Sequence, residues 1–463
     1  MDSLRYEEIC AYLRSLIKDT KWEGKVYAVG GCCRDMIMGR EIHDIDLAVN
    51  LPNGGIEFAE YLHHKKLTVG KPLVFPRFGT ARTHLKRFPA DEIELVQTRK
   101  EKYTDKNSAN PSTAFGTISD DCFRRDLTIN SLYQNISTGE ILDLTGKGID
   151  DIRNQVIRTP SSPDITFDDD PLRILRCIRF ANKYGWNIQP ETYEAMLKNV
   201  PRLSIVSPDR ARGEFEKMLM SDNPAAAFGM LKETGALAYF MPELMRLDFP
   251  YDRSGMTVWE HTMEVLSRMP ASLPLRLAAL LHDVGMEEQT ESSAGSDGHE
   301  MKSQSLVKPM LRRLKVPTET IHEAAFLVRN HNTLRDAGAH GQDLNPRKLR
   351  RLQFQCGTPE RFESLMTLID ADNRIGAYAG RLARQVEAVR VKSDAFRDAG
   401  TDMFGYKLPV SEKDIRRIKR ISSPAALTRC KNHLMKQAYL NPARSREEFI
   451  SLLRAYSPPR GKK

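Results

Sequence analysis

Two carboxylates near the N-terminus have the spacing of a metal site. Asp44 and Asp46 stand at positions i and i+2, separated by the apolar Ile45. In a strand such side chains point to the same face, where they could share Mg²⁺ ions bridged by substrate phosphates. These ions neutralise the charge that develops on the oxygens of an in-line displacement. The pattern predicts metal-dependent nucleotidyl transfer, although a solvated strand face would explain the two acids taken alone.

A glycine pair lies just before these acids. Gly30 and Gly31 follow the apolar residues 26–29 and precede a short helix that Gly39 is expected to end. Glycine lets backbone N–H groups approach a triphosphate, and a helix N-terminus favours negative charge. Arg34, in the first turn, could donate a charge-assisted hydrogen bond to a phosphate oxygen. The order and spacing of the glycines and acids together favour a nucleotide site.

A third acid is expected to hold the metal or to help deprotonate the attacking hydroxyl. Glu92 and Glu94 both lie in the alternating run 91–97. Glu94 is the better candidate, because Ile93 and Leu95 place it opposite the apolar face and further inside the strand. A salt-bridged edge strand is the alternative explanation of this run.

A later helix carries side chains that could read a base. Residues 168–180 begin with acids and a proline, typical of a helix start, and continue with arginines at successive i+3 positions. Asp170 and Arg173 lie one turn apart, so an acceptor and a donor can sit side by side. Such a pair fits cytosine and adenine and rejects uracil and guanine, which present the reverse pattern. Arg176 and Arg179 would face the triphosphate. Capping acids and a solvated arginine stripe are the structural alternative.

The composition indicates a water-soluble protein of several domains. The chain has 463 residues, 40% hydrophobic and 28% charged, and no apolar stretch approaches the length of a membrane span. Acids stand at the N-terminus where a signal peptide needs a basic start, so we expect a cytoplasmic location without membrane association. Seven cysteines without a C-x-x-C pair indicate neither a disulfide framework nor a zinc knuckle.

The charge of the chain indicates a polyanionic partner. The formal net charge is +9, and neutralising phosphates supplies affinity for nucleic acid without reading its sequence. Basic residues gather near the C-terminus, at 347–351, 416–420 and 444–446. Each run alone could be a solvated helix face. Together they predict an RNA-binding tail.

The periodicity changes from mixed to helical along the chain. An amphipathic helix near 4–17 precedes a strand-rich region from 26 to about 144, and the chain after 146–148 is helical in pattern. Two stretches rich in turn formers, 106–117 and 287–298, predict loops. We therefore expect a small mixed sheet with helices, followed by a long all-helical portion.

Five motifs, in order along the chain, resemble those of class II CCA-adding tRNA nucleotidyltransferases, in the polymerase-β-like superfamily that includes bacterial poly(A) polymerases. They are GGCCRD with DID, RRDLTIN, LDLTGKGIDDI, DDPLRILRCIRF and, more weakly, SPDRARGEFEKML. The resemblance implies metal binding by Asp44 and Asp46. It also implies nucleotide contacts by Gly31, Arg34, Arg125, Asp170, Arg173, Arg176 and Arg179. Asp169 departs from the pattern, which has Glu at this position.

The C-terminal half resembles the HD domain appended to some of these enzymes. The resemblance implies a second site for a divalent metal, built by His261, His282, Asp283 and Asp372, with His299 and His331 as candidate extra ligands. The usual lysine of the H-D-x-G-K motif is Met286 in this chain. That departure puts phosphohydrolase activity in doubt more than the fold.

The resemblance implies an α+β nucleotidyltransferase head over 1–147, a helical neck and body over 148–250, an HD-like domain over 251–376 and a basic helical tail over 377–463. It implies an enzyme that adds CCA to the 3′ end of tRNA from CTP and ATP with Mg²⁺. Poly(A) addition is the nearest alternative, disfavoured because Phe78-Gly79-Thr80 replaces an arginine-rich segment. A-only or C-only addition stays open. An HD phosphohydrolase and a non-catalytic RNA-binding module are disfavoured by the intact acids.

Overall fold

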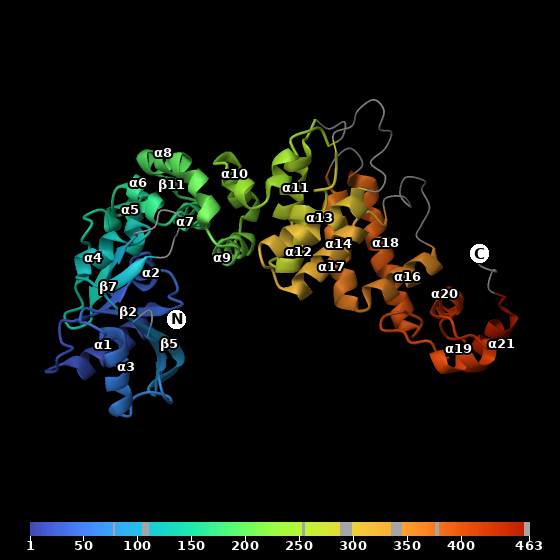
Figure 1. The fold of residues 1–463 in the computed structure, drawn as a ribbon, viewed down its shortest axis with the longest axis horizontal. Coiled ribbons are helices and arrows are strands. Elements are labelled where there is room, and N and C mark those ends of the chain that lie inside the picture. Colours follow the sequence, from blue (N-terminus) through green and yellow to red (C-terminus); the bar gives the residue numbers. More distant parts are fainter. Residues whose placement is uncertain are drawn as a thin grey trace. The chain divides into compact units, whose positions relative to one another are not determined.

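The structure is a computed structural model that describes residues 1–76, 79–103, 111–251, 255–287, 299–334, 345–375 and 379–457. Phe78 and most of the predicted loop 287–298 therefore lie outside the described residues. The chain forms two compact units, Met1–Pro242 and Glu243–Lys463, coloured blue to green and yellow to red in Figure 1. The finer domain boundaries stay predictions.

A seven-stranded sheet in the order β3-β4-β5-β2-β1-β8-β9 lies at the centre of the first unit. Its strands are β1 (Val26–Val29), β2 (Ile45–Val49), β3 (Leu73–Phe75), β4 (Thr80–Leu85), β5 (Phe88–Gln97), β8 (Tyr133–Asn135) and β9 (Ile141–Leu142). Strands β2 and β5 are parallel, and the other neighbours run antiparallel. The predicted mixed sheet is confirmed.

Alternation along the strands separates the two faces of this sheet. On one face, Tyr27, Ala48 and Tyr133 pack against Cys122 of α4 (Ile118–Phe123). The opposite face is covered by α3 (Gly54–His64), which contacts β2, β4 and β5. Because strand residues two apart share a face, Asp46 points to the same side as Ala48. The candidate metal ligands thus belong to the α4 face.

A separate two-stranded ribbon stands beside the sheet. It pairs β6 (Arg99–Lys102) with β7 (Ser112–Phe115) in antiparallel register. The prediction of a loop over 106–117 is wrong for β7, because pairing with β6 orders a segment whose polar composition indicates a turn. Non-local strand pairing of this kind leaves little trace in local composition.

The rest of the first unit is mainly helical. Its remaining elements are α1 (Ser3–Ile17), α2 (Gly31–Ile37), α5 (Gly148–Asn154), α6 (Pro163–Asp169), α7 (Leu172–Tyr184), α8 (Pro190–Asn199), α9 (Pro208–Leu219) and α10 (Pro224–Glu233), with short 3₁₀ turns. The apolar side of α7, with Ile174, Leu175 and Ile178, is fully buried. One short parallel pair, β10 (Val156–Ile157) with β11 (Asn187–Ile188), departs from the predicted all-helical pattern.

The described part of the second unit is helical. Its helices are α11 (Val258–Ser267), α12 (Leu273–Leu281), α13 (His299–Arg313), α14 (Thr318–Asn330), α16 (Pro346–Cys356), α17 (Pro359–Asn373), α18 (Ala379–Asp398), α19 (Glu412–Lys419), α20 (Pro424–Leu440) and α21 (Arg446–Ala455). Helices α19, α20 and α21 close around Leu434 and Phe449. Among the residues that the structure describes, no helix has the length and apolar character needed to cross a membrane.

The packing of α3 on the sheet can be tested at Gly55. A Cβ at this position would stand 2.6 Å from the carbonyl oxygen of Leu95, a backbone atom that cannot easily move. We expect Gly55→Ala to lower the free energy of unfolding by roughly 2 kcal/mol or more. Gly213 in α9 has open space around it, so Gly213→Ala is a matched control expected to be neutral or slightly stabilising. Urea unfolding compares them, and equal stabilities would contradict the close contact.

Candidate active site

A cavity of about 640 Å³ lies in the first unit. The residues that line it come from the sheet, from the ribbon, from the end of α4 and from the helices around α7. They include Asp46, Thr80, Glu94, Arg99, Glu101, Tyr103, Thr113, Arg124, Arg125, Asp126, Asp170, Arg173, Arg176 and Arg210. Candidate metal ligands and candidate base-reading residues, far apart in the sequence, therefore share one cavity.

The carboxylates at the sheet end of the cavity are held together by strand pairing. In the parallel register of β2 and β5, Asp46 stands directly beside Glu94, and Arg82 forms an ion pair with Glu94 at 3.0 Å. Burial, together with the negative charge of Glu94, raises the pKa of Asp46 to about 6. Asp44 is exposed and immediately precedes β2. A divalent cation would relieve the repulsion between these acids, and oxygen ligands suit Mg²⁺.

The predicted glycine turn lies at the start of α2. Gly30 has φ +74°, a left-handed conformation that favours glycine, and precedes the first helical residue, Gly31. A Cβ on Gly30 would stand 3.2 Å from the guanidinium of Arg125. Arg125 lines the cavity and donates hydrogen bonds to Asp121 and to the hydroxyl of Tyr133. The structure thus brings the turn and Arg125 together at one side of the cavity.

Two of the predicted phosphate-binding arginines do not line this cavity. Arg34 is buried and donates to the carboxylate of Asp35 and the side-chain oxygen of Asn130. Arg179 donates to Glu214 and lies over the ring of Phe180. Sequence spacing placed both arginines near the nucleotide, but acids and amides nearby engage them in this structure. Their nucleotide contacts stay predictions.

Asp170 and Arg173 both line the cavity, each with partners of its own. Asp170 accepts a 2.6 Å hydrogen bond from Arg210 and also caps the start of α7 through a backbone N–H. Arg173, with little exposure, donates to the backbone carbonyls of Thr166 and Arg124. The alternative explanation of Asp170 as a helix-capping acid is therefore correct, although Asp170 also lines the cavity. The alternative of a solvated arginine stripe is wrong, because Arg173 is buried.

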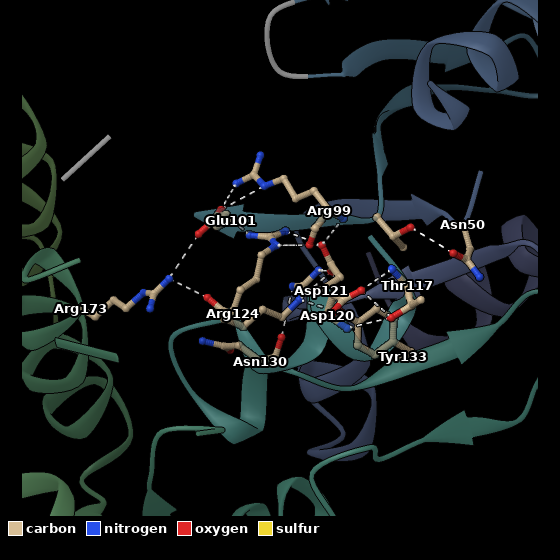
Figure 2. Close-up of polar contacts among 12 residues, drawn as sticks. Asn50, Arg99, Glu101, Thr117, Asp120, Asp121, Arg124, Asn130, Tyr133 and Arg173 are labelled. Carbon is tan, nitrogen blue, oxygen red and sulfur yellow. Dashed lines mark hydrogen bonds and ion pairs between the residues drawn. The ribbon is translucent and has the colours of Figure 1, made fainter. Parts of the chain in front are cut away.

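Buried acids hold the arginines around the cavity, as Figure 2 shows for Asp121. Asp121 accepts from Arg124, Arg125 and the Tyr133 hydroxyl. Burial alone would raise the pKa of Asp121, but Arg125 and Arg124 more than offset it and hold the pKa below its usual range. Charge-assisted hydrogen bonds of this kind fix the direction of each guanidinium.

A second buried acid, Asp126, orients an arginine of α7. Arg176 donates to the carboxylate of Asp126 at 2.6 Å. Burial would raise the pKa of Asp126, but Arg176 and the amide of Asn130 lower it to about 2. Arg176 remains partly exposed at the cavity wall. It is therefore the arginine of α7 that the structure places best for a phosphate.

Several residues of the cavity were not singled out by the sequence. They are Arg99, Glu101, Tyr103, Arg124, Asp126 and Arg210. Arg124 and Asp126 flank Arg125 in the RRDLTIN motif, so their positions in that motif could have identified them as candidates. The ribbon residues carried no signal, because their partners lie on other elements.

The second unit holds a separate cluster of buried histidines and acids. Two groups have ligand atoms close enough to hold a metal ion: His261, His282 and Asp372, and Asp283, His299 and His331. The acid Asp283 connects them, with Oδ2 3.2 Å from Nε2 of His282 and Oδ1 3.0 Å from Nε2 of His299. The structure thus brings together the four predicted ligands and both candidate extra ligands.

Backbone contacts determine which ring nitrogen carries a proton in two of these histidines. Nδ1 of His282 lies 2.7 Å from the carbonyl oxygen of Ala279, and Nδ1 of His331 lies 2.7 Å from that of Val328. Since a carbonyl only accepts, each Nδ1 must donate, and in a neutral ring Nε2 then presents its lone pair. Nε2 of His282 lies 3.3 Å from Nε2 of His261. This donor set fits divalent transition metals.

Two family models match the chain between residues 26 and 247. Residues 26–158 match the poly A polymerase head domain, and residues 185–247 match the probable RNA and SrmB-binding site of polymerase A. The tRNA nucleotidyltransferase cca1 of Schizosaccharomyces pombe is 35% identical over 288 residues, 58% of this chain and 55% of that protein. The match thus spans about half the length of the yeast relative.

A bacterial relative is covered more completely. The Multifunctional CCA protein of Cupriavidus metallidurans is 32% identical over 373 residues, 76% of this chain and 84% of that protein. The fold resembles that of the CCA-adding enzyme of Bacillus stearothermophilus solved in complex with CTP, with a TM-score of 0.66, 22% identity and 98% of both chains covered. With the cavity, the motifs and these relatives in agreement, the chain belongs to the family of CCA-adding tRNA nucleotidyltransferases.

Proposed function

We propose that this protein adds C, C and A to the 3′ end of tRNA, using CTP and ATP with Mg²⁺ in the cytoplasm. The observation that carries the proposal is one cavity lined both by Asp46 and Glu94 of the sheet and by Asp170 and Arg173 at the start of α7. The first pair suits phosphoryl chemistry and the second suits base selection. Relatives named tRNA nucleotidyltransferase cca1 and Multifunctional CCA protein support the same activity.

Different residues of the cavity would serve different parts of the reaction. Asp44, Asp46 and Glu94 would hold Mg²⁺, which supplies charge stabilisation for in-line displacement when bound. Arg125 and the Gly30 turn would bind and orient the triphosphate. Glu94 would also accept the proton of the attacking 3′ hydroxyl, a role that its partial exposure at the cavity wall supports.

Base selection would use the pair at the neck end of the cavity. Asp170 would accept a hydrogen bond from the exocyclic amine of cytosine or adenine, and Arg173 would donate to the adjacent ring nitrogen. With uracil or guanine, the acceptor Asp170 would face another acceptor and the donor Arg173 would face another donor. Leaving buried polar groups unpaired in this way costs free energy. Arg210 already donates a hydrogen bond to Asp170 at 2.6 Å, which fixes the position of this carboxylate.

The basic tail would bind the body of the tRNA. Arg416, Arg417 and Lys419 lie on α19, whose other side packs Ile415 into the core of the tail. Arg417 and the neighbouring residues are exposed in part to solvent. Contacts with phosphates would give affinity without reading sequence.

The proposal is tested with the purified protein, tRNA lacking its 3′ CCA and each nucleotide in turn, with products resolved at single-nucleotide length. We expect C, C and A to be added and growth then to stop; long A tails would favour poly(A) addition, and A or C alone would favour the restricted enzymes. Asp46→Ala and Glu94→Gln should each lower incorporation of both nucleotides by at least roughly 100-fold, because charge stabilisation is lost.

A matched control for this experiment lies on the same strand. Glu92, two residues before Glu94 on β5, is exposed and forms ion pairs at the sheet surface. Glu92→Gln should therefore keep near-normal turnover. Near-normal turnover of folded Asp46→Ala, or equal losses in the Glu92 and Glu94 variants, would contradict the catalytic assignment.

The base-reading pair is tested by Arg173→Ala. This change leaves Asp170 without its donor neighbour, so CTP and ATP should lose most of their advantage over UTP and GTP, by roughly tenfold or more. Competition between nucleotides in the same assay measures the change in preference. Unaltered preference at lower speed would mean that Arg173 serves the packing of α7 and not base selection.

A second candidate function belongs to the histidine cluster of the second unit. We propose that it holds two divalent metal ions, one with His261, His282 and Asp372 and one with His299 and His331, with Asp283 between them. The bridging position of Asp283, whose two oxygens face different histidines, supports two ions. Such ions, when bound, activate water for hydrolysis of phosphate esters. Met286 in place of the usual lysine argues for testing the metal before the activity.

Metal analysis of the full chain tests this site. After incubation with Mn²⁺ or Ni²⁺ and removal of excess ion, we expect about two bound equivalents by elemental analysis. His282→Ala and His299→Ala should each lose about one, since each removes a ligand from a different group. His322 is exposed on α14, and His322→Ala should lose none. Nucleotide addition should be unchanged in all three, and absence of bound metal in the unaltered chain would contradict the proposal.

A further inference from the structure

We propose that Glu101, on the ribbon strand β6, is a positioning residue for nucleotide selection: it holds Arg173 in the direction that a cytosine or adenine requires. The inference rests on the proposed function, because it concerns how the base is chosen in that reaction. Glu101 belongs to neither the metal candidates nor the base-reading pair. It acts through Arg173 and does not itself contact the base.

The contacts of Glu101 support this role. Its side chain is 6% exposed. One carboxylate oxygen accepts hydrogen bonds from Arg99 at 3.1 Å and Arg124 at 3.0 Å. The other accepts from the hydroxyl of Tyr103 at 3.0 Å and lies 3.6 Å from the guanidinium of Arg173. Figure 2 shows Arg99, Arg124 and Arg173 approaching this one carboxylate from different elements.

The charge of Glu101 matters because it forms an ion pair with Arg173, in addition to the electrostatic interaction of Arg173 with Asp126 and Asp169. Arg173 donates to backbone carbonyls of Thr166 and Arg124, which orient its fork but do not balance its charge. A carboxylate in direct contact stabilises a buried guanidinium far more than a carbonyl does. Removing that negative charge would leave Arg173 beside Arg124 with weaker restraint on its direction.

A misdirected Arg173 should affect selection and not chemistry. Discrimination between bases depends on an N–H of Arg173 lying beside the acceptor oxygen of Asp170, a geometry of tenths of an ångström. Asp46 and Glu94 lie on β2 and β5 of the sheet, whereas the described partners of Glu101 come from the ribbon, the residue that follows β6, the end of α4 and α7. Loss of Glu101 is therefore expected to reduce preference while leaving the turnover of bound CTP nearly unchanged.

The position of Glu101 also links selection to the ribbon. Glu101 pairs with Thr113 of β7, and Tyr103 and Thr113 both line the cavity. The hydroxyl of Tyr103 donates to Glu101, so the ribbon and the base-reading arginine share one carboxylate. The ribbon would thus contribute to specificity through the contact of Glu101 with Arg173.

The test uses Glu101→Gln, which keeps the size of the side chain and removes its charge. We expect the preference for CTP and ATP over UTP and GTP, measured as the ratio of kcat/KM values, to fall roughly tenfold. The KM for CTP should rise while kcat for CTP stays within about threefold. Tyr103→Phe, which removes one donor to Glu101, should shift the same ratio in the same direction by a smaller factor. Glu57→Gln on α3, an exposed pair with Lys21, is the matched control and should change neither value.

The outcomes separate this inference from the function on which it rests. Glu101→Gln and Tyr103→Phe with unaltered nucleotide preference would overturn it. So would an equal fall in kcat for all four nucleotides, which would indicate a general structural role. Should Glu101→Gln fail to fold, Tyr103→Phe decides alone. If the unaltered protein adds neither C nor A, the proposed function itself fails, and that result is read from the control protein before any variant is compared.

Discussion

Charge balance in a buried wall is the constraint on which the candidate active site depends. Asp121, Asp126 and Glu101 are nearly excluded from solvent, and each binds the guanidinium of at least one arginine that lines the cavity. A buried guanidinium without an acid would cost several kcal/mol, and so would the acid without its arginine. Together they produce a surface on which each guanidinium has a fixed position and orientation. Binding a triphosphate and a base requires this fixed orientation more than it requires a high net charge.

Strand register supplies the opposite charge at the other end. Only β2 and β5 run parallel in the sheet, and this pairing places Asp46 beside Glu94. A shift of one residue in either strand would turn its acid toward α3 and the apolar core. The site therefore needs the hydrophobic alternation of two strands, Leu47 and Leu95 on one face and the acids on the other, as much as it needs the acids.

The buried acids are balanced by different groups in the two units. In the first, acids pair with arginines, which cannot lose their protons, so each buried acid has a positively charged partner without a ligand. In the second, Asp283 faces histidine nitrogens, and Nδ1 of His282 and of His331 lies against a carbonyl, so that Nε2 of each ring, when neutral, would offer a lone pair. Acids and lone pairs together favour a cation. Each cluster lies inside one unit, so the chemistry proposed for one does not require the other.

The sequence by itself determined the mixed sheet, the helical remainder and several residues that line the cavity, among them Asp46, Glu94, Asp170 and Arg173. These features depend on local periodicity and on motifs a few residues long, as with Asp46 and Asp170. The sequence misplaced β7 as a loop and did not reveal the partners of Arg34 or Arg179.

Only the tertiary structure decided that Glu101 meets Arg173, that Asp46 stands beside Glu94 in register, and that Asp283 connects two groups of histidines. These contacts join segments far apart in the chain. Their energies come from burial and from geometry between elements, and neither quantity is encoded in the spacing of neighbouring residues.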